Sequence, residues 1–424
     1  MKYSNFNIIK EHKNCKVLYN SFTKAAILFE KNYDLSFVND NDTIEKLPKE
    51  IKKAFISHGI IIDNDRNELE ELKYAFLKKY FEKSALTISL IPTLNCNFDC
   101  PYCCEKPFTV NEESLNNYFD ILEKFSKENF KNWKNVHVNL FGGEPLIYYN
   151  YAKKYIEWLE NDSKMNSYSY SIGLITNGSL LNEENLHFLI AHNLNVIQIT
   201  LDSDKENHDN MRKFKNGKPS FDLLITKIEL VAKLLETNKF FFVLRINLNN
   251  TNLSKVKKSL EEISVKYRKN INIMFRVIYN TQTYKEKNSN EISKLEEYID
   301  LGKELGFKTY NESYVLQTCE AANDSRTFYI LPDMTLTKCA NEIGCDACVF
   351  GKILNDGSIQ LDSEKLINWF NINYEVFSNE KCTNCKMLPD CLGGCPLYKV
   401  KNNKRSCRAY DMVSLPNYYG EINE

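Results

Sequence analysis

The stretch TLNCNFDCPYCC at residues 93–104 decides how the rest of the sequence is interpreted. Cys96, Cys100 and Cys103 are spaced C-x3-C-x2-C and follow the apolar run 86–91, which predicts a β-strand. Three thiolates on one short loop can ligate three irons of a cubane cluster and leave the fourth iron open. Zinc sites instead usually draw their cysteines from two separated pairs. The spacing therefore favours an iron–sulfur cluster over zinc.

The chain has 14 cysteines in 424 residues, and 13 of them fall between 96 and 104 or between 319 and 407. No signal peptide is visible, and no apolar run approaches the roughly 18 residues of a membrane span. We therefore expect a cytoplasmic chain with reduced thiols, in which metal binding is favoured over disulfides. Cys104, whose side chain should point away from that of Cys103, is interpreted as a spare thiol. The 55 basic and 56 acidic side chains nearly cancel, so neither nucleic acid nor a membrane surface is an expected partner.

Strand-like and helix-like stretches alternate between residues 85 and 300. This alternation predicts βα units and an α/β fold with a parallel sheet, open or curled into a partial barrel. Functional loops should then gather at the carboxyl ends of the strands. Strands are expected at 86–91, 136–141, 168–175, 196–201, 241–247 and 271–278, and helices at 113–130, 151–161, 182–192, 221–237 and 253–266.

The first 82 residues contain no dense cysteine motif. Short strands are expected at 6–9 and 16–19, and the stretch Thr23–Glu30 has helical character. Apolar residues recur at three- and four-residue steps from Leu69 to Tyr80, which indicates an amphipathic helix capped within Asp63–Asn64. After residue 300, short strands at 327–331 and 335–337 flank a turn, and the rest looks too loop-rich to fold on apolar burial alone, so metal would help.

With these motifs in place, the sequence resembles the radical S-adenosylmethionine (SAM) family, whose cysteine triplet ends the first strand of a partial (βα)6 barrel. Residues 142–145 read GGEP after the second strand and match the family's GGEP loop. Asn177 follows the third strand. After the fourth strand, ITLDSDKENHDNMR at 199–212 resembles the family's S-L-D-G-x-x-x-x-H-D-x-x-R stretch, with Ser203 in place of the usual glycine.

The resemblance implies roles for individual residues. Glu144 would receive the amino group of SAM, Thr200 would meet its ribose, and Arg212 would take its carboxylate. A glycine pair lets the backbone approach a ligand closely. The implied catalytic residues are the cluster ligands Cys96, Cys100 and Cys103, and the implied SAM-binding residues are Tyr102, Gly142, Gly143, Glu144, Asn177, Thr200 and Arg212. Arg245 and Asn247 resemble a polar pair often found after strand five.

The second cysteine region resembles the SPASM extension, which carries two auxiliary [4Fe–4S] clusters. Its C-x2-C-x5-C-x3-C core is followed by one more cysteine, and the resemblance implies auxiliary cluster II on Cys382, Cys385, Cys391 and Cys407. Auxiliary cluster I would take Cys319, Cys339 and Cys395, with its fourth position open to Cys345, Cys348 or substrate. Met334 replaces the glycine usual in the hairpin turn, which suggests a different turn conformation. On spacing alone, zinc-ribbon-like sites fit about as well as clusters.

The resemblance implies that one electron from the reduced cluster cleaves SAM to methionine and a 5′-deoxyadenosyl radical, which abstracts hydrogen from the substrate. We expect three parts: a winged-helix-like leader-recognition segment (1–82), a radical SAM core (83–300) and a SPASM domain (301–424). The expected substrate is a ribosomally made precursor peptide, modified most simply by a thioether cross-link, and the expected electron donor is a flavodoxin or ferredoxin. A carbon–carbon cross-link stays open, as do formylglycine formation as in anaerobic sulfatase maturases and a zinc-stabilised binding protein.

Overall fold

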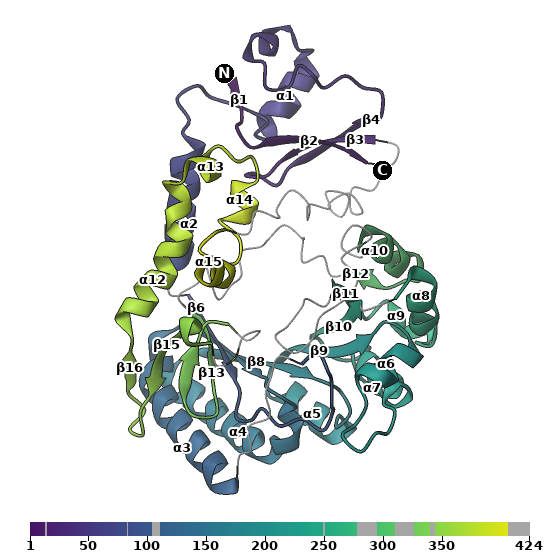
Figure 1. Cartoon of the computed structure of the whole chain (residues 1–424), viewed down its shortest axis with the longest axis vertical. Coiled ribbons are helices and arrows are strands. Elements are labelled where there is room, and N and C mark those ends of the chain that lie inside the picture. The colour runs from purple at the N-terminus through teal and green to yellow at the C-terminus, as the bar shows by residue number, and fades with distance from the viewer. Residues whose placement is uncertain are drawn as a thin grey trace. The chain divides into compact units, whose positions relative to one another are not determined.

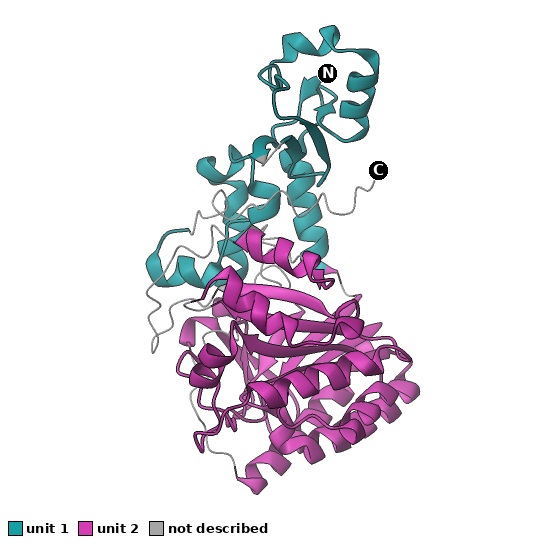
Figure 2. Ribbon diagram, turned by 90° about the vertical axis from the view of Figure 1, so that its right-hand side faces the viewer, with its two compact units in different colours: residues 1–81, 311–325, 367–424 teal, residues 82–310, 326–366 magenta. Residues whose placement is uncertain are grey.

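The structure is a computed structural model that describes residues 1–12, 15–82, 84–103, 111–248, 251–277, 295–309, 326–339, 343 and 345–405. The chain divides into two compact units (Figure 2). The described part of unit 1 lies within residues 1–81 and 367–405, and that of unit 2 within 82–309 and 326–366. The units therefore cut across the three expected segments, because the segment after residue 300 is shared between both.

Unit 2 is built on a sheet in which all six expected strands are present and parallel. The order is β12-β11-β10-β9-β8-β7-β6-β13-β14-β15-β16, an open arrangement that confirms the partial-barrel α/β fold (Figure 1). Its first seven strands along the chain are β6 (Ala85–Leu90), β7 (Asn135–Leu140), β8 (Ser169–Thr176), β9 (Leu194–Asp202), β10 (Phe241–Leu248), β11 (Asn272–Val277) and β12 (Lys308–Thr309). Ile278, the expected end of β11, lies outside the described residues.

Helices follow these strands as the sequence predicts, with bounds shifted by a few residues. They are α3 (Glu112–Asn129), α4 (Tyr149–Asn166), α5 (Glu183–Ala191), α7 (Phe221–Leu234), α8 (Leu253–Glu261), α9 (Val265–Arg268) and α10 (Leu295–Glu304). The short α6 (Lys205–Met211) and α10 were not predicted, and the single helix expected at 253–266 is divided into α8 and α9. None of the helices in the described part of the chain is both long and apolar enough to cross a membrane.

The strands of the sheet have two different faces because side chains alternate along a strand. On β9, Ile197, Ile199 and Leu201 are fully buried, whereas Gln198 and Thr200 on the other face are only half-buried. The same alternation on β7 puts polar side chains on the second face, where His137 hydrogen-bonds Ser171 of β8 at 2.8 Å. The second face is therefore polar, as expected of a surface that receives a ligand.

The sheet continues beyond β6 into a meander of shorter strands. β13 (Thr327–Ile330) pairs in parallel with β6, and β14 (Thr335–Thr337), β15 (Val349–Ile353) and β16 (Ile359–Leu361) follow antiparallel. The expectation of a different turn at Met334 is wrong, because its φ is +67°, the left-handed conformation that glycine favours. Burial of the Met334 side chain offsets a conformational cost of about 1–2 kcal/mol.

Unit 1 begins with a small sheet followed by helices. β2 (Asn7–His12), β3 (Cys15–Asn20) and β4 (Ala26–Glu30) form an antiparallel meander, and β1 (Lys2–Tyr3) pairs with β5 (Ile61–Ile62). The helical expectation for Thr23–Glu30 is wrong, because residues 26–30 form β4 and pair with β3. Alternate residues of β4, Ile27 and Phe29, pack with Phe55 of α1 (Lys49–Ser57).

The predicted amphipathic helix is present as α2 (Glu68–Phe81). Its start is capped not within Asp63–Asn64 but by Asn67, whose side chain accepts from the backbone N–H of Glu70 at 3.3 Å. A cap must lie next to the first turn to reach its free N–H groups, so the earlier residues are too far along the chain.

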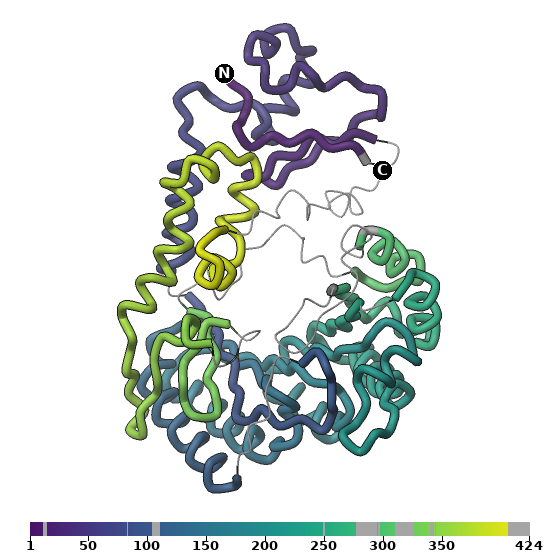
Figure 3. The backbone as a smooth tube through the Cα atoms, viewed as in Figure 1, coloured from purple at the N-terminus to yellow at the C-terminus, as the bar shows by residue number. Residues whose placement is uncertain are grey.

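The C-terminal part of unit 1 packs onto these N-terminal elements. α2 and α12 (Ser363–Tyr374) run side by side (Figure 3), and Phe370 stacks on Phe76 with ring centroids 6.3 Å apart. The short helices α13 (Glu380–Thr383), α14 (Leu388–Cys391) and α15 (Pro396–Asn402) follow. Met387 is buried against Val17 and Tyr19 of β3. Apolar contacts with the N-terminal sheet therefore support the cysteine-rich turns.

Replacing Met387 by Ala should test this packing. Met387 is 1% exposed, so its truncation should lower the free energy of unfolding by about 2–5 kcal/mol. Met165→Ala, at a side chain that is 75% exposed, should change it by less than about 0.5 kcal/mol. Urea unfolding of both variants measures the difference, and equal midpoints would show that the N-terminal sheet does not support this region.

Candidate active site

The cysteine loop that follows β6 is anchored to the segment after α6. The backbone N–H of Asp99 donates to the carbonyl of Lys213 at 3.0 Å, and that of Lys215 donates to the carbonyl of Asn97 at 2.9 Å. Phe98 and Phe214 pack edge to face with ring centroids 4.8 Å apart. These contacts hold residues 96–103 at the carboxyl ends of the strands, where the sequence predicts the site.

The three thiols of this loop share one environment. The Cys96 sulfur accepts from the N–H of Phe98 at 3.4 Å and from the side-chain amide of Asn177 at 3.6 Å. Burial raises the pKa of Cys100 to about 12, while the positive charge of Arg212 opposes the rise and the neighbouring Cys103 and Cys96 add to it. A cationic cluster of iron would favour the thiolates that burial disfavours.

The GGEP loop lies directly against the backbone of the cysteine loop. Gly143 N–H donates to the carbonyl of Thr93 at 3.2 Å, and Glu144 N–H donates to that of Asn95 at 2.9 Å. A Cβ on Gly143 would stand 2.2 Å from the Asn95 carbonyl oxygen, and Gly142 has a φ of +119°. The glycine pair therefore makes room for the cysteine loop, a use that the sequence did not reveal.

Glu144 is fully buried at the joint between β7 and β8. One carboxylate oxygen accepts from the Thr176 hydroxyl at 2.7 Å and from Leu146 N–H at 3.0 Å, and the other accepts from Asn177 N–H at 2.7 Å. Burial raises the pKa of Glu144, and these hydrogen bonds oppose the rise. The second oxygen holds one hydrogen bond and keeps the capacity to accept another from an ammonium group.

Tyr102 and Asp202 form the centre of a second buried network. The Tyr102 hydroxyl donates to the Asp202 carboxylate at 2.9 Å and accepts from Arg212 Nη1 at 3.0 Å. Asn247 donates to Asp202 at 3.1 Å and accepts from Arg245 Nε at 2.9 Å. The polar pair Arg245 and Asn247 expected after strand five therefore reaches the same place as Tyr102.

Arg212 contributes a buried guanidinium to this network and keeps one N–H donor for a further hydrogen bond. It is 7% exposed, and its Nε has no hydrogen-bond partner among the described residues. A buried donor without a partner is costly and points to an acceptor supplied by a ligand. Burial lowers the pKa of Arg245, and the nearby positive charge of Arg276 adds to the fall. A carboxylate fits this position.

Thr200 stands apart from these hydrogen-bonded groups. It lies half-buried on β9 in register with Arg245 of β10, on the polar face of the sheet. Ser203, where the family has glycine, is buried and accepts from the Asn207 side chain at 2.7 Å. It has no positive φ, so the turn does not need glycine there.

His208 positions two residues of the site. It lies in the motif at 199–212, in which the sequence assigns it no role. Its Nδ1 accepts from the backbone N–H of Asp202 at 3.0 Å. Its Nε2 donates to the Ser220 hydroxyl at 3.0 Å, and that hydroxyl donates to the Arg212 carbonyl at 2.7 Å. This chain of hydrogen bonds requires a neutral ring, and burial lowers the pKa of His208 well below its usual value of 6.5. His208 therefore ties the backbone of Asp202 to that of Arg212.

The remaining cysteines are divided between the two units. Cys339, Cys345 and Cys348 lie in unit 2, whereas Cys382, Cys385, Cys391 and Cys395 lie in unit 1. Cys104, Cys319 and Cys407 fall outside the described residues. Across the part of the chain that is described, no three His, Cys, Asp or Glu side chains are arranged to hold a single metal ion.

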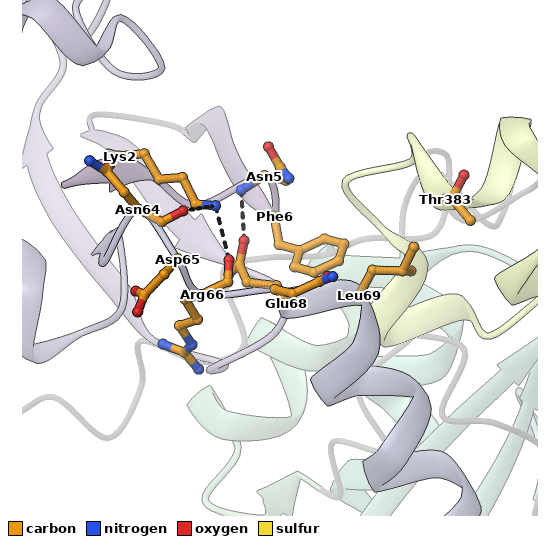
Figure 4. Close-up of a pocket in the computed structure, with 10 residues that line it drawn as sticks. Lys2, Asn5, Phe6, Asn64, Asp65, Arg66, Glu68, Leu69 and Thr383 are labelled. Carbon is orange, nitrogen blue, oxygen red and sulfur yellow. Dashed lines mark hydrogen bonds between the residues drawn. The ribbon is translucent and has the colours of Figure 1, made fainter.

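A pocket in unit 1 offers no competing chemistry. Figure 4 shows this cavity of about 280 Å³ between the first residues and the start of α2. Lys2 donates to the carbonyls of Asn64 and Arg66 there, and Glu68 accepts from Ser4 and from the backbone of Asn5. Lys2 and Glu68 therefore use their charged groups in hydrogen bonds to the surrounding loops.

The family comparison agrees with this geometry. Residues 90–263 match the radical SAM superfamily, the range that holds the cysteine loop, Glu144 and Arg212. This range is a radical SAM domain. The chain is therefore a radical SAM enzyme, and the family implies SAM and a [4Fe–4S] cluster as cofactors.

Individual relatives extend the match beyond the domain. Radical SAM cyclopropyl synthase TigE of Paramaledivibacter caminithermalis is 23% identical over 90% of this chain and 82% of its own. The cysteine-type anaerobic sulfatase-maturating enzyme of Clostridium novyi is 24% identical over 73% of this chain and 87% of its own. The structure of Streptococcus suis SuiB bound to precursor peptide SuiA has a TM-score of 0.53 and 15% identity, covering 95% of this chain and 97% of that chain. The fold is therefore similar to SuiB over almost the whole chain.

The buried neutral ring of His208 predicts a pH dependence of stability. Because its pKa is lowered in the folded state, the unfolded chain takes up a proton below about pH 6.5 while the folded chain does not. Stability should fall with decreasing pH, by at most about 1.4 kcal/mol per pH unit for this one proton. His208→Gln keeps one donor and one acceptor and should remove this contribution.

Urea unfolding of wild type and variant at pH 7.5 and pH 5.5 measures the effect. His187→Gln, at an exposed histidine of α5, is the matched control and should behave as wild type. Identical losses of stability in wild type and His208→Gln would contradict a neutral buried ring.

Proposed function

We propose that this enzyme modifies a ribosomally made precursor peptide by radical SAM chemistry, most simply by forming a thioether cross-link. The observation that carries the radical SAM site is the convergence of the cysteine loop, Glu144 and the free donor of Arg212 at one end of the sheet. Support for a peptide substrate comes from SuiB, whose structure matches 95% of this chain and holds the precursor peptide SuiA.

The described residues fit the cofactors that the family implies. Cys96, Cys100 and Cys103 are proposed to ligate three irons of the cluster, which leaves the fourth iron for SAM. The unpartnered Nε of Arg212 suits the SAM carboxylate, and the free acceptor capacity of Glu144 suits its amino group. Tyr102 and Asp202 hold the Arg212 side chain in place, because the Tyr102 hydroxyl bridges the two.

A bound and reduced [4Fe–4S] cluster would supply the electron that cleaves SAM to methionine and a 5′-deoxyadenosyl radical. The chain's own residues bind and orient the reactants and exclude water from them. Gly142 and Gly143 allow the GGEP loop to close on the cysteine loop, and Asn177 links β8 to that loop through Asn97 at 2.7 Å. Thr200, on the polar face between the two networks, is proposed to contact the ribose.

We assign the C-terminal cysteines to two auxiliary clusters, in keeping with the SPASM resemblance. Cys382, Cys385 and Cys391, with Cys407, would hold auxiliary cluster II. Cys382 packs against Phe6 and Leu72, and the other two pack against Met387, so all three lie on the side of unit 1 that the N-terminal sheet covers. Auxiliary cluster I would use Cys319, Cys339 and Cys395, with its fourth position open to Cys345, Cys348 or substrate. These clusters would take up the electron that the substrate radical loses as it is oxidised to product, and a flavodoxin or ferredoxin would reduce the enzyme.

The N-terminal segment of residues 1–82, called the N-terminal lobe below, is proposed to bind the leader part of the peptide. It has the strand-then-helix order expected of a winged-helix-like recognition segment. Among the described residues β4 pairs only with β3, so its other edge can receive a peptide strand. Leu28 on this edge strand is 44% exposed. A hollow of about 390 Å³ along α1, lined by three lysines and Ile56, lies on the helix that packs against β4.

Formylglycine formation is the second candidate function. The match to the C. novyi sulfatase-maturating enzyme favours it, over 73% of this chain. Both candidates use the same radical site and differ in the need for the N-terminal lobe. Deleting that lobe is a poor test because it covers the cysteine-rich turns of unit 1. A change confined to the β4 edge separates the two functions better.

Replacing Cys96, Cys100 and Cys103 together by Ala should abolish SAM cleavage. Three cubanes correspond to about 12 irons per chain, so about eight should remain with their absorbance. Anaerobic purification, iron analysis and assay of 5′-deoxyadenosine measure both effects. Cys15→Ala, at the start of β3, is the control and should leave both unchanged. Undiminished 5′-deoxyadenosine in the triple variant would refute the assignment, and a colourless wild type with stoichiometric zinc would favour a zinc-stabilised binding protein.

Replacing Leu28 by Asp should weaken binding of a candidate precursor peptide, to be sought as a short Cys-rich reading frame beside the gene. Burying a leucine is worth about 1.5–3 kcal/mol, so the dissociation constant should rise at least about tenfold. Leu361→Asp, at an exposed leucine of edge strand β16, should bind as wild type. Fluorescence anisotropy of labelled peptide gives the affinities. Equal affinity of both variants would show that the peptide does not dock on the β4 edge. SAM cleavage without peptide should stay unchanged in each variant.

A further inference from the structure

Residues 177–179 form a tight turn directly after β8. The side-chain oxygen of Asn177 accepts from the backbone N–H of Ser179 at 2.9 Å, which is the geometry of an Asx turn. Gly178 between them has a φ of +88°, a left-handed conformation that glycine adopts without strain. The Ser179 hydroxyl also donates to the Asn177 side-chain oxygen, at 2.6 Å. Both acceptor positions of that oxygen are therefore occupied from within the turn.

This turn fixes the orientation of the Asn177 amide group. The backbone N–H of Ser179 can only donate, so the Asn177 atom that it contacts must be the oxygen and not the nitrogen. The amide nitrogen then faces the cysteine loop. It donates to the side-chain oxygen of Asn97 at 2.7 Å and to the Cys96 sulfur at 3.6 Å.

Asn97 closes a ring of hydrogen bonds with the turn. Its side-chain nitrogen donates to the Ser179 hydroxyl at 2.8 Å, that hydroxyl donates to Asn177, and Asn177 donates back to Asn97. Asn177 and Ser179 are buried, so rotating either side chain would leave polar atoms without partners. Because Asn97 follows Cys96 directly in the chain, the ring holds the Asn177 amide against the Cys96 sulfur.

The side chain of Asn177 has no hydrogen-bonding capacity left for SAM. A primary amide offers two N–H donors and two acceptor lone pairs. The donors are used by Asn97 and Cys96, and both lone pairs are used by Ser179. The SAM-binding role that the family resemblance implied for Asn177 would break this arrangement.

A hydrogen bond to a ligating sulfur changes the charge that a cluster has to carry. Cys96 is one of the three proposed ligands of the cluster that cleaves SAM, called the core cluster. An N–H donor partly neutralises the thiolate, and it does so most favourably in the reduced cluster, which carries one more negative charge. Such a donor therefore stabilises the reduced form. Cys96 accepts twice, because the backbone N–H of Phe98 also donates to its sulfur, at 3.4 Å.

We propose that Asn177 acts on the core cluster and not on SAM: its amide donates to the Cys96 thiolate and raises the reduction potential of the cluster. A higher potential favours reduction by a flavodoxin or ferredoxin, which loses the one electron that the cluster gains. Asn177 is thus a positioning residue, since it acts through Cys96. This role rests on the proposed radical SAM function and adds a residue that sets how readily the cluster is reduced.

Replacing Asn177 by Ala should lower the reduction potential of the core cluster in the full-length protein. At a fixed potential the ratio of reduced to oxidised core cluster should fall by about tenfold, a shift of about 59 mV for one electron. Iron content should stay at about 12 per chain, because every proposed ligand remains. Anaerobic redox titration followed by EPR measures the potential, and the core signal is the one missing from the variant that lacks Cys96, Cys100 and Cys103.

Ser179→Ala is the matched control. It opens the same ring but keeps the backbone N–H that orients the Asn177 amide, so the potential should stay near that of wild type. Equal shifts in Asn177→Ala and Ser179→Ala would overturn the proposal, because they would show a general disturbance of the turn. An unchanged potential in Asn177→Ala at full iron content would overturn it as well.

A measurement on wild type alone decides the case in which Asn177→Ala does not retain the core cluster. Protein with an isotope label on the side-chain nitrogen of its asparagines should show coupling of that nitrogen to the reduced core cluster in pulsed EPR. No such coupling would overturn the proposal. A wild-type protein without the core signal would instead refute the radical SAM function itself, and the role of Asn177 with it.

Discussion

Glu144 places a fully buried carboxylate where β7 and β8 end, and hydrogen bonds from Leu146, Thr176 and Asn177 hold it there. A buried carboxylate is tolerated only when its oxygens are hydrogen-bonded, so the two strand ends cannot move apart without a large penalty. Asn177 in turn donates to Asn97 and approaches the Cys96 sulfur. One buried charge therefore sets the position of the cysteine loop relative to the sheet, and the remaining contacts of the site build on that joint.

The α/β core was predictable because its local and global signals agree. Each strand is an apolar run with a helix-length connector after it, and the polar residues that follow each strand must meet at one edge of a parallel sheet. The strand order therefore predicts that Cys96, Glu144, Asn177 and Arg212 lie at the same edge. Asn177 contacts both Cys96 and Glu144, and Arg212 contacts the cysteine loop through Tyr102. The SAM and cluster roles came from family resemblance, since spacing alone does not distinguish a ligand from a structural contact.

What the sequence did not predict depends on contacts between distant segments. Residues 26–30 are an apolar run that fits a helix or a strand, and pairing with β3 decides for the strand. Met334 adopts a glycine-like φ because its side chain is buried, which propensity alone does not anticipate. Gly143 is required by the Asn95 carbonyl, a neighbour 48 positions away in the chain. In each case, tertiary packing overrides the local preference.

Packing in unit 1 adds to the expectation that metal would help the cysteine-rich tail to fold. Between Cys385 and Cys391, the side chain of Met387 packs against β3, and buried Asp390 accepts from the Tyr19 hydroxyl at 3.1 Å and pairs with Lys24. Burial raises the pKa of Asp390, and Lys24 opposes that rise, so the pair keeps the charge tolerable inside the fold. One face of the N-terminal sheet thus supports the cysteine turns while the β4 edge stays open. Peptide recognition and ligation of auxiliary cluster II would then belong to a single folding unit, in which β3 pairs with the edge strand β4 and also contacts the cysteine turns.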